Sequence, residues 1–434
     1  MLCKHGLSMK IKEPEAGATH SRIGGQARAR GFRSLRLICL LAFCVRLIAL
    51  AMVQHWPMNE GSELWKSGPE IVNIAASIAS HRGFSSPFGV PSGPTAWIPP
   101  VYPYLVGTIF MIVGPRSNLA ALLILTMQAL LSTLTCIPIY GIAKRAFQED
   151  SALWATWGWA LFPYAIVIPV LFVWETALSG FLLTFLCYLC LDLPHARRLT
   201  LVAIGLVWGI AALTNPALLS TMPVFLICPY LRKPLHLPWK AIATILLISA
   251  LVVFPWFLRN WREFGAVIPV RDNFGEEFWM GNHAGGSGRI EFGLGPADNE
   301  IQRERYRALG EISYVAQRKA EALNFVSENR IQFLRQTFYR LRYWWFAEGE
   351  PAPLFLFYRL LALISLVGMA LALRVKGEGT VLTMVAAILV YPVVYYLTDV
   401  YARYRYPIEP LMMIVAGLAI SQGRLWGKRK FGKS

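Results

Sequence analysis

The sequence is short of charged residues, because Asp, Glu, Lys and Arg together make up only 15% of its 434 residues. A soluble domain usually carries about 25%. Lipid-facing helix surfaces cannot hold charge cheaply, but they accept the apolar residues that form 56% of this chain. The shortage of charge therefore excludes an ordinary soluble domain and indicates an integral membrane protein.

Metal-binding patterns are also lacking. The chain has no H-E-x-x-H motif, and His283 has no partner at metal-ligand spacing. It has no D-x-D of the kind that holds the metal of nucleotide-sugar enzymes, which argues against a cytosolic enzyme of that type. We expect no cofactor. A divalent metal ion is compatible with the sequence, but no residue pattern indicates one.

None of the seven cysteines lies in a long polar loop, and all except Cys3 fall within or beside apolar runs. This placement excludes a disulfide framework and a zinc site.

Acidic residues are outnumbered, with 25 Asp and Glu against 42 Lys and Arg, for a net charge of +17. Such an excess can indicate a nucleic-acid partner. Here, however, much of the Lys and Arg lies in the N-terminal arm, in short loops between apolar runs and in the C-terminal tail. That pattern is typical of topology signals that face anionic lipid, so we predict a bilayer partner and no nucleic acid.

What the chain has in abundance is apolar runs. They lie at about residues 37–53, 117–143, 151–168, 170–191, 199–213, 216–231, 239–258, 355–374, 380–397 and 407–424. Several fall short of the ~20 residues that span a bilayer, so their bounds are loose. The first run could be the core of a signal peptide, but its basic arm is unusually long and more spans follow. We therefore predict an all-α polytopic protein with about ten transmembrane helices.

The domain organisation follows from this pattern. Residues 1–36 are basic and aperiodic, and we interpret them as a disordered cytoplasmic arm. Residues 37–424 form a single transmembrane domain, and residues 425–434 form a basic cytoplasmic tail. The basic clusters between spans fall on one side, which the positive-inside rule assigns to the cytoplasm. Both termini are then inside, and the two long loops, about 54–116 and 259–350, are outside.

Two segments of these loops need a separate interpretation. Pro100–Gly114 is apolar, but its roughly 15 residues are short for a span, and a crossing there would turn the basic loops outward. We interpret it as a re-entrant or interfacial helix. Ile331–Phe346 mixes Arg with aromatic residues at helical spacing, which predicts a helix that lies in the membrane interface.

The first outer loop contains the carboxylates Glu60, Glu63 and Glu70. Glu70 follows Pro69 and opens a helix-like stretch, where the helix N-terminus would stabilise its anion. A carboxylate of this kind can serve as a general base. The alternative is a helix-capping or solvated glutamate.

Two more polar residues lie in or beside apolar runs, where they are costly. Arg46 is in the first run and Glu175 is near the outer end of another. Their cost makes both functional candidates. A structural ion pair or a side chain that snorkels to the interface is the alternative for each.

Several motifs of these loops carry a family resemblance. The first loop has E-x-x-x-I-A-x-S-I-A at Glu70–Ala79, then Gly83–Phe88, Gly93–Trp97 and Pro99–Pro103. It resembles the first outer loop of bacterial glycosyltransferases related to protein O-mannosyltransferases and lipid A aminoarabinose transferases, which have the GT-C fold. Phe254–Asn260 with Gly281-Asn282, and Tyr401–Pro410, resemble two further family segments.

The resemblance covers most of the chain beyond residue 37. It implies a GT-C-like bundle and an enzyme that moves a sugar, with inversion, from a polyprenyl-phosphate donor to an acceptor hydroxyl on the outer face. That acceptor is a lipid, a glycan or a protein. In this family an acidic residue commonly precedes the matching glutamate by a few positions, where this chain has Ser67. Glu70, Glu63 and Glu60 therefore all stay candidates for the catalytic base.

The donor phosphate needs fixed cations, for which Arg is well matched. The candidate substrate-binding residues are Arg403, Arg405, Tyr404, Arg259, Asn282, Arg46, Glu175 and Tyr102. For the arginines near the last span, membrane anchoring is the alternative role.

Two other functions are compatible with the sequence. A transporter or flippase for lipid-linked sugars would also need outward arginines, but the paired broken helices typical of such proteins are not evident. A non-catalytic subunit that binds lipid-linked glycan is the second alternative. The expected location is a bacterial inner membrane.

Overall fold

The computed structural model describes residues 17–231, 238–374 and 378–431, and within these ranges the chain is helical, without a β-strand. The α-helices are α1 (Gly17–Val53), α2 (Glu63–Lys66), α3 (Pro69–Ala79), α4 (Val101–Val113), α5 (Asn118–Leu134), α6 (Cys136–Ala146), α7 (Glu149–Leu161), α8 (Pro163–Leu171), α9 (Thr176–Cys190), α10 (Arg198–Ala212), α11 (Met222–Ile227), α12 (Trp239–Phe264), α13 (Phe274–Gly281), α14 (Glu300–Leu309), α15 (Glu311–Glu328), α16 (Arg330–Phe346), α17 (Leu354–Ala372), α18 (Glu378–Val390), α19 (Val393–Leu397) and α20 (Glu409–Phe431). Short 3-10 turns are η1 (Leu193–His195), η2 (Pro216–Thr221), η3 (Cys228–Tyr230) and η4 (Ala402–Ile408).

Among the described residues, 6 helical segments are long and apolar enough to cross a membrane. They are Leu35–Val53, Asn118–Ala146, Trp239–Phe264, Leu354–Ala372, Gly379–Leu397 and Ala402–Trp426. A further span would combine α7 and α8, which are bent by 40°. The other three expected runs are the shorter apolar helices α9, α10 and Pro216–Tyr230. The all-α polytopic membrane fold is therefore confirmed.

Some expected bounds differ from the structure. The runs predicted at 151–168 and 170–191 are divided at Phe162, and again before Thr176. Pro163 explains the first break, because proline cannot donate the hydrogen bond of a continuous helix.

The predicted arm and tail also differ. Residues 17–36, predicted to be disordered, continue α1, and no proline interrupts them. Helix propagation from an apolar span is easier than nucleation, which explains the extension. At the other end, α20 runs on to Phe431 into the predicted tail. Residues 1–16 and 432–434 lie outside the described residues.

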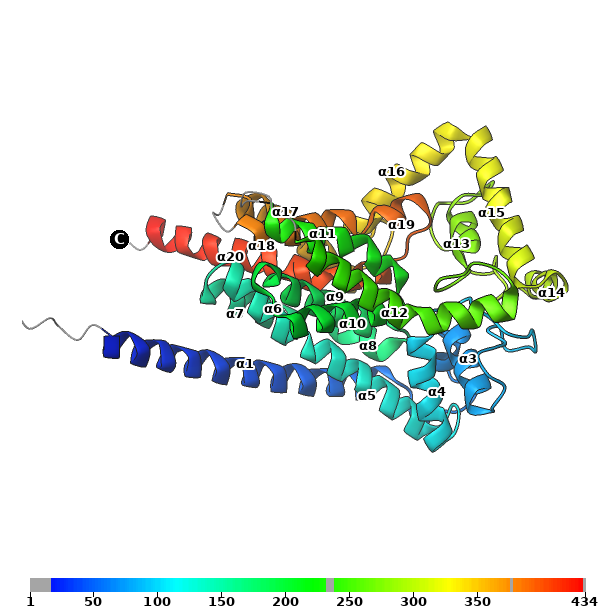
Figure 1. Cartoon of the computed structure of the whole chain (residues 1–434), viewed down its shortest axis with the longest axis horizontal. Coiled ribbons are helices and arrows are strands. Elements are labelled where there is room, and N and C mark those ends of the chain that lie inside the picture. The colour runs from blue at the N-terminus through cyan, green and yellow to red at the C-terminus, as the bar shows by residue number, and fades with distance from the viewer. Residues whose placement is uncertain (1–16, 232–237, 375–377, 432–434) are drawn as a thin grey trace, which may run out of the picture.

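The bundle has two distinct ends (Figure 1). The start of α1 and the end of α20 lie at one end, and α3, α4 and α13–α16 lie at the other. Arg145, in the last turn of α6, pairs with Asp192, which brings the end of α6 next to the end of α9. The two long loops are thus at the end opposite the termini. Which end faces the cytoplasm stays a prediction.

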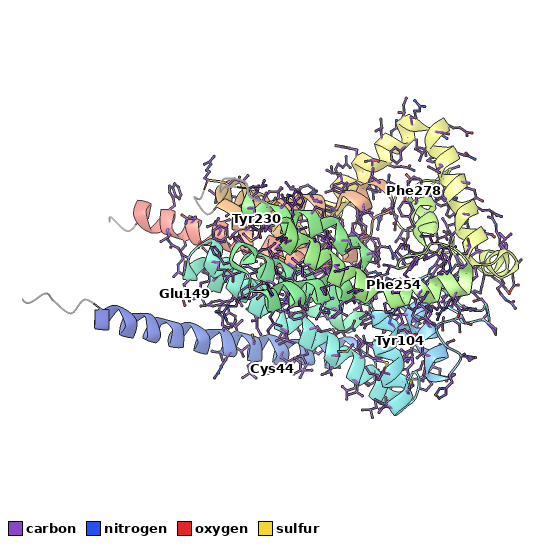
Figure 2. All side chains as sticks on the ribbon, viewed as in Figure 1. Cys44, Tyr104, Glu149, Tyr230, Phe254 and Phe278 are labelled. Carbon is purple, nitrogen blue, oxygen red and sulfur yellow. The ribbon has the colours of Figure 1, made fainter. Side chains whose placement is uncertain are left out.

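Exposed apolar side chains cover the outside of the bundle, as expected for a surface in contact with lipid. Phe254 of α12 is 53% exposed, and it is labelled with the exposed Cys44 of α1 in Figure 2. Inside the bundle, small residues let helices approach closely. A Cβ atom on Gly209 of α10 would lie 2.4 Å from Cβ of Val252 in α12.

The two ambiguous loop segments are helices. α4 has 13 residues and packs against α3 and α5 at the loop end of the bundle. α16 exposes Ile331, Leu334 and Phe338 on one side, at helical spacing. The re-entrant or interfacial position of α4 and the interfacial position of α16 stay predictions.

A buried ion pair joins the last span to its neighbours. Arg405 and Glu409 are 0% exposed and lie 2.9 Å apart. Arg405 also donates to the carbonyl oxygens of Trp345 and Tyr358, at 3.0 and 2.9 Å. One side chain thereby connects α16, α17 and the η4–α20 segment.

Replacing Arg405 by Ala leaves the Glu409 carboxylate buried without its partner. We expect Arg405→Ala to destabilise the protein by about 3–5 kcal/mol. The measurement is the thermal unfolding midpoint of the detergent-solubilised protein. Arg198→Ala, at an exposed arginine at the start of α10, is the control and should leave the midpoint unchanged. An equal midpoint for both variants contradicts the structural role.

Candidate functional site

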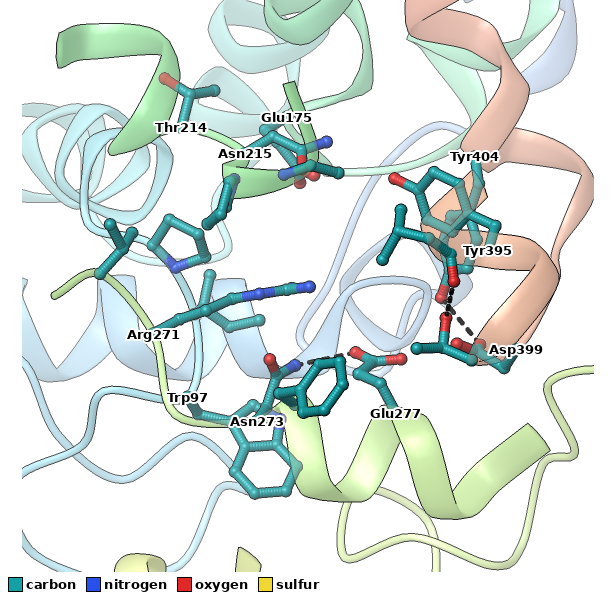
Figure 3. Close-up of a pocket in the computed structure, with 18 of the residues that line it drawn as sticks. Trp97, Glu175, Thr214, Asn215, Arg271, Asn273, Glu277, Tyr395, Asp399 and Tyr404 are labelled. Carbon is teal, nitrogen blue, oxygen red and sulfur yellow. Dashed lines mark hydrogen bonds between the residues drawn. The ribbon is translucent and has the colours of Figure 1, made fainter. Parts of the chain in front are cut away.

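A cavity of about 450 Å³ lies where the two long loops meet the bundle (Figure 3). Its lining comes from the start of α3, the α8–α9 connection, η2, the segment between α12 and α13, α13 itself, and residues 394–404. Segments far apart in the sequence thus close around one space. Its titratable side chains are Glu70, Glu175, Arg271, Glu277, Asp399, Arg403, Tyr395 and Tyr404.

Glu70 occupies the first turn of α3, directly after Pro69. A close approach fixes this turn, because a Cβ atom on Gly68 would lie 2.4 Å from the carbonyl oxygen of Val173. Any side chain at position 68 would push α3 away from the α8–α9 connection. Burial raises the pKa of Glu70, while its own backbone amide and Arg403 act in the opposite direction. The helix N-terminus therefore does not keep the pKa of this carboxyl low.

Glu175 precedes the first residue of α9, and its carboxylate does not cap the helix. Gln128 holds the preceding segment, because its Nε2 donates to the carbonyl oxygens of Pro169 and Phe172, both at 3.0 Å. Tyr102 Oη in turn donates to Gln128 Oε1 at 2.9 Å. Tyr102 thus lies behind the cavity wall and supports it through Gln128. Burial raises the pKa of Glu175 to about 7.

Two arginines reach the cavity. The Arg403 guanidinium lies 4.0 Å from the ring centroid of Trp174, and its Nε is buried without a hydrogen-bond partner. Arg271 extends into the space between Glu175 on one side and Glu277 on the other (Figure 3). Within the described ranges neither guanidinium forms an ion pair. Both charges are free to meet an anionic ligand.

The remaining wall is rich in oxygen. Asn273 Nδ2 donates to Glu277 Oε1 at 2.8 Å, and Tyr404 Oη donates to Asp399 Oδ2 at 3.4 Å. Burial raises the pKa of Asp399, and Glu277 adds to this effect. The sequence interpretation found Tyr404 but missed Arg271, Asn273, Glu277 and Asp399. These lie in or near irregular connections, where neither a repeated pattern nor an apolar context marks them.

Asn282 supports this wall from behind. It is fully buried and donates to the carbonyl oxygen of Leu397 at 2.9 Å. Arg340 donates to Asn282 Oδ1 and, at 2.8 Å, to the carbonyl oxygen of Tyr396. Burial lowers the pKa of Arg340 to about 10. These contacts fix α13 against the α19–η4 connection.

Other candidates from the sequence do not line the cavity. Glu60 and Glu63 are exposed, and Glu63 pairs with Lys66 at 2.8 Å. Arg405 is committed to Glu409, and Arg259 donates to the carbonyl oxygens of Thr95 and Phe84.

Arg46 is also absent from the cavity wall. It is fully buried and donates to Ser132 Oγ and to the carbonyl oxygens of Ala42, Ala160 and Trp159. These bonds connect α1, α5 and α7.

Among the described residues, no group of three or more His, Cys, Asp and Glu side chains could hold a metal ion. A partly exposed carboxyl with a raised pKa can take up a proton, and two unpaired guanidinium groups can hold a phosphate.

No protein-family model and no curated protein matches this sequence. Solved structures do resemble it. The lipid A aminoarabinose transferase ArnT from Cupriavidus metallidurans, bound to undecaprenyl phosphate, aligns with a TM-score of 0.56 and 14% identity. The alignment covers 92% of this chain and 62% of ArnT.

The oligosaccharyltransferase AglB from Archaeoglobus fulgidus, in complex with an inhibitory peptide and a dolichol-phosphate, aligns with a TM-score of 0.53 and 14% identity. That alignment covers 93% of this chain and 52% of AglB. The chain thus spans about half to three fifths of the length of these structures, and it has the GT-C fold that ArnT and AglB share.

Proposed function

We propose that this chain is a membrane glycosyltransferase that transfers a sugar from a polyprenyl phosphate to an acceptor hydroxyl, with inversion at the anomeric carbon. One observation carries the proposal: the same cavity holds a glutamate with a raised pKa and two arginines without an ion pair. Two solved structures with this fold, ArnT and AglB, hold undecaprenyl phosphate and dolichol-phosphate.

In the proposed reaction Glu70 is the general base. It takes the proton of the acceptor hydroxyl as the oxygen attacks the anomeric carbon, and the bond to the lipid phosphate breaks. The leaving phosphate gains negative charge, which Arg271 and Arg403 stabilise. A phosphate is already a good leaving group, so one carboxylate suffices, unlike the carboxylate pair of most glycosidases.

The expected partners are the bilayer, a polyprenyl-phosphate sugar and a lipid, glycan or protein acceptor. The cavity is lined by residues of α3 and α13, which lie at the end of the bundle opposite the termini (Figure 1). With the basic end in the cytoplasm, as the positive-inside rule predicts, transfer takes place on the outer face of a bacterial inner membrane.

Glu70→Gln removes the base and keeps the shape of the side chain. We expect the rate of transfer from the cognate polyprenyl-phosphate sugar to fall by about 10²–10⁴-fold. Glu63→Gln and Glu60→Gln are matched controls on the same loop and should retain the rate, because both side chains are exposed. Full activity of Glu70→Gln would disprove its role as the base.

The pH dependence of kcat/KM gives a second test. The base works as the anion, and burial raises the pKa of Glu70, so activity should rise with pH through a limb above the ordinary glutamate pKa of about 4.3. The pKa of Glu175 is also raised, to about 7. The limb should nevertheless persist in Glu175→Gln. If the rise of activity with pH is lost in that variant, the titrating group is Glu175 and not Glu70.

The arginines are tested by binding alone. Arg271→Ala and Arg403→Ala should each weaken binding of decaprenyl phosphate by about tenfold or more, because each removes a charge-assisted contact. The measurement is a titration of the detergent-solubilised protein. Arg198→Ala should bind like the unaltered protein. Unchanged affinity in both cavity variants places the phosphate elsewhere.

A further inference from the structure

One wall of the cavity carries hydrogen-bond acceptors that no described part of the chain satisfies. Asn273 and Asp399 are 2% and 1% exposed, and Oδ1 of each lacks a donor. Both residues line the cavity. A buried acceptor without a donor costs free energy, so native structures rarely leave one unexplained. Two such oxygens in one cavity wall indicate a ligand that brings hydrogen-bond donors.

Glu277 and Phe274 complete this wall. They lie three residues apart on α13 and therefore share a face of that helix. Asn273 directs its amide Nδ2 to Glu277, which leaves Oδ1 as the free atom of the amide. The Phe274 ring is 52% exposed, and it stacks on Phe278 with a centroid distance of 5.9 Å. The wall thus combines acceptor oxygens with an open aromatic face.

That combination matches the chemistry of a sugar ring. Hydroxyl groups donate hydrogen bonds to carboxyl and amide oxygens. The apolar C–H face of the ring can pack on an aromatic side chain. A phosphate fits this wall poorly, because it offers acceptors and negative charge where the wall already has both. Arg271 and Arg403, which lack ion pairs, suit the phosphate instead.

We infer that Asn273, Glu277, Asp399 and Phe274 form the subsite for the donor sugar, and that they select a neutral sugar with at least two free hydroxyl groups facing this wall. The inference rests on the proposed function for the identity of the ligand. An acidic sugar is selected against, because its carboxylate would lie beside Glu277 and Asp399. The cavity is thereby divided into a phosphate side and a sugar side.

The test compares lipids that differ only in the sugar. Decaprenyl phosphate, bare or linked to glucose, galactose, mannose or glucuronic acid, is titrated into the detergent-solubilised full chain. At least one neutral sugar should improve affinity about tenfold or more over the bare lipid, and glucuronic acid should not. Asp399→Asn and Asn273→Ala should remove most of that gain and leave the affinity for the bare lipid within about twofold.

Controls keep the result interpretable. Asp150→Asn, at an exposed aspartate next to Glu149, which lies toward the end of the bundle that holds the termini (Figure 2), should keep the full gain. Phe274→Ala, whose ring is half exposed, should lower the gain and tests the subsite even if a buried substitution prevents folding. Methyl glycosides of the same sugars, which carry no lipid phosphate, are titrated in parallel. They show whether the wall binds an acceptor sugar instead of the donor sugar.

Four results would overturn the subsite. The first two are that no neutral sugar improves the affinity over the bare lipid, and that glucuronic acid improves it most. The third is that the wall variants weaken the binding of bare and sugar-linked lipid equally. The fourth is that these variants affect the binding of methyl glycosides alone. The readout needs no turnover. If binding depends on the sugar but no transfer occurs, the proposed enzyme activity is contradicted and the subsite is supported.

Discussion

A polar group buried in a membrane protein has to find its partner within the protein, because the bilayer core offers none. Arg46 meets this constraint by donating to Ser132 and to three carbonyl oxygens, so that one costly side chain ties α1 to α5 and α7. Arg405 does the same through Glu409 and two carbonyl oxygens. In both cases the burial of charge is compensated by contacts that fix the helix packing.

The cavity lining contains exceptions to this rule. Arg403 Nε, Asn273 Oδ1 and Asp399 Oδ1 are buried there without a hydrogen-bond partner. Groups left unsatisfied in this way destabilise the protein alone and bind a complementary ligand better. Arg46 avoids the cost of an unpaired buried group through its hydrogen bonds. The unpaired atoms of the cavity still carry that cost, which favours the binding of a complementary ligand.

The sequence predicted the all-α membrane fold well because its strongest signal, the length of the apolar runs, is local. The orientation that the basic residues indicate stays a prediction. The sequence also identified Glu70, Glu175, Arg403 and Tyr404, which the structure brings into one cavity. Motif and apolar context were sufficient there.

Other residues could not be sorted from the sequence. Arg46 and Arg403 were both candidates for substrate binding, and only the three-dimensional contacts show that Arg46 is hydrogen-bonded within the bundle while Arg403 Nε has no partner. Asp399 and Arg271 lie in irregular connections that have no periodicity to read. Their importance depends on contacts between segments distant in sequence, which no local pattern records.

Those distant contacts also explain what Arg259 and Asn282 do. Arg259 donates to the carbonyl oxygens of Thr95 and Phe84, so it joins α12 to the first long loop. Asn282 joins the end of α13 to the α19–η4 connection that carries Asp399. Glu70 comes from the first long loop, Arg271 from the segment between α12 and α13, and Arg403 from η4, so each lies in or beside a segment joined in this way. The cavity geometry therefore depends on hydrogen bonds between loops outside the cavity. A residue in a family motif can form such a supporting bond and need not contact the ligand.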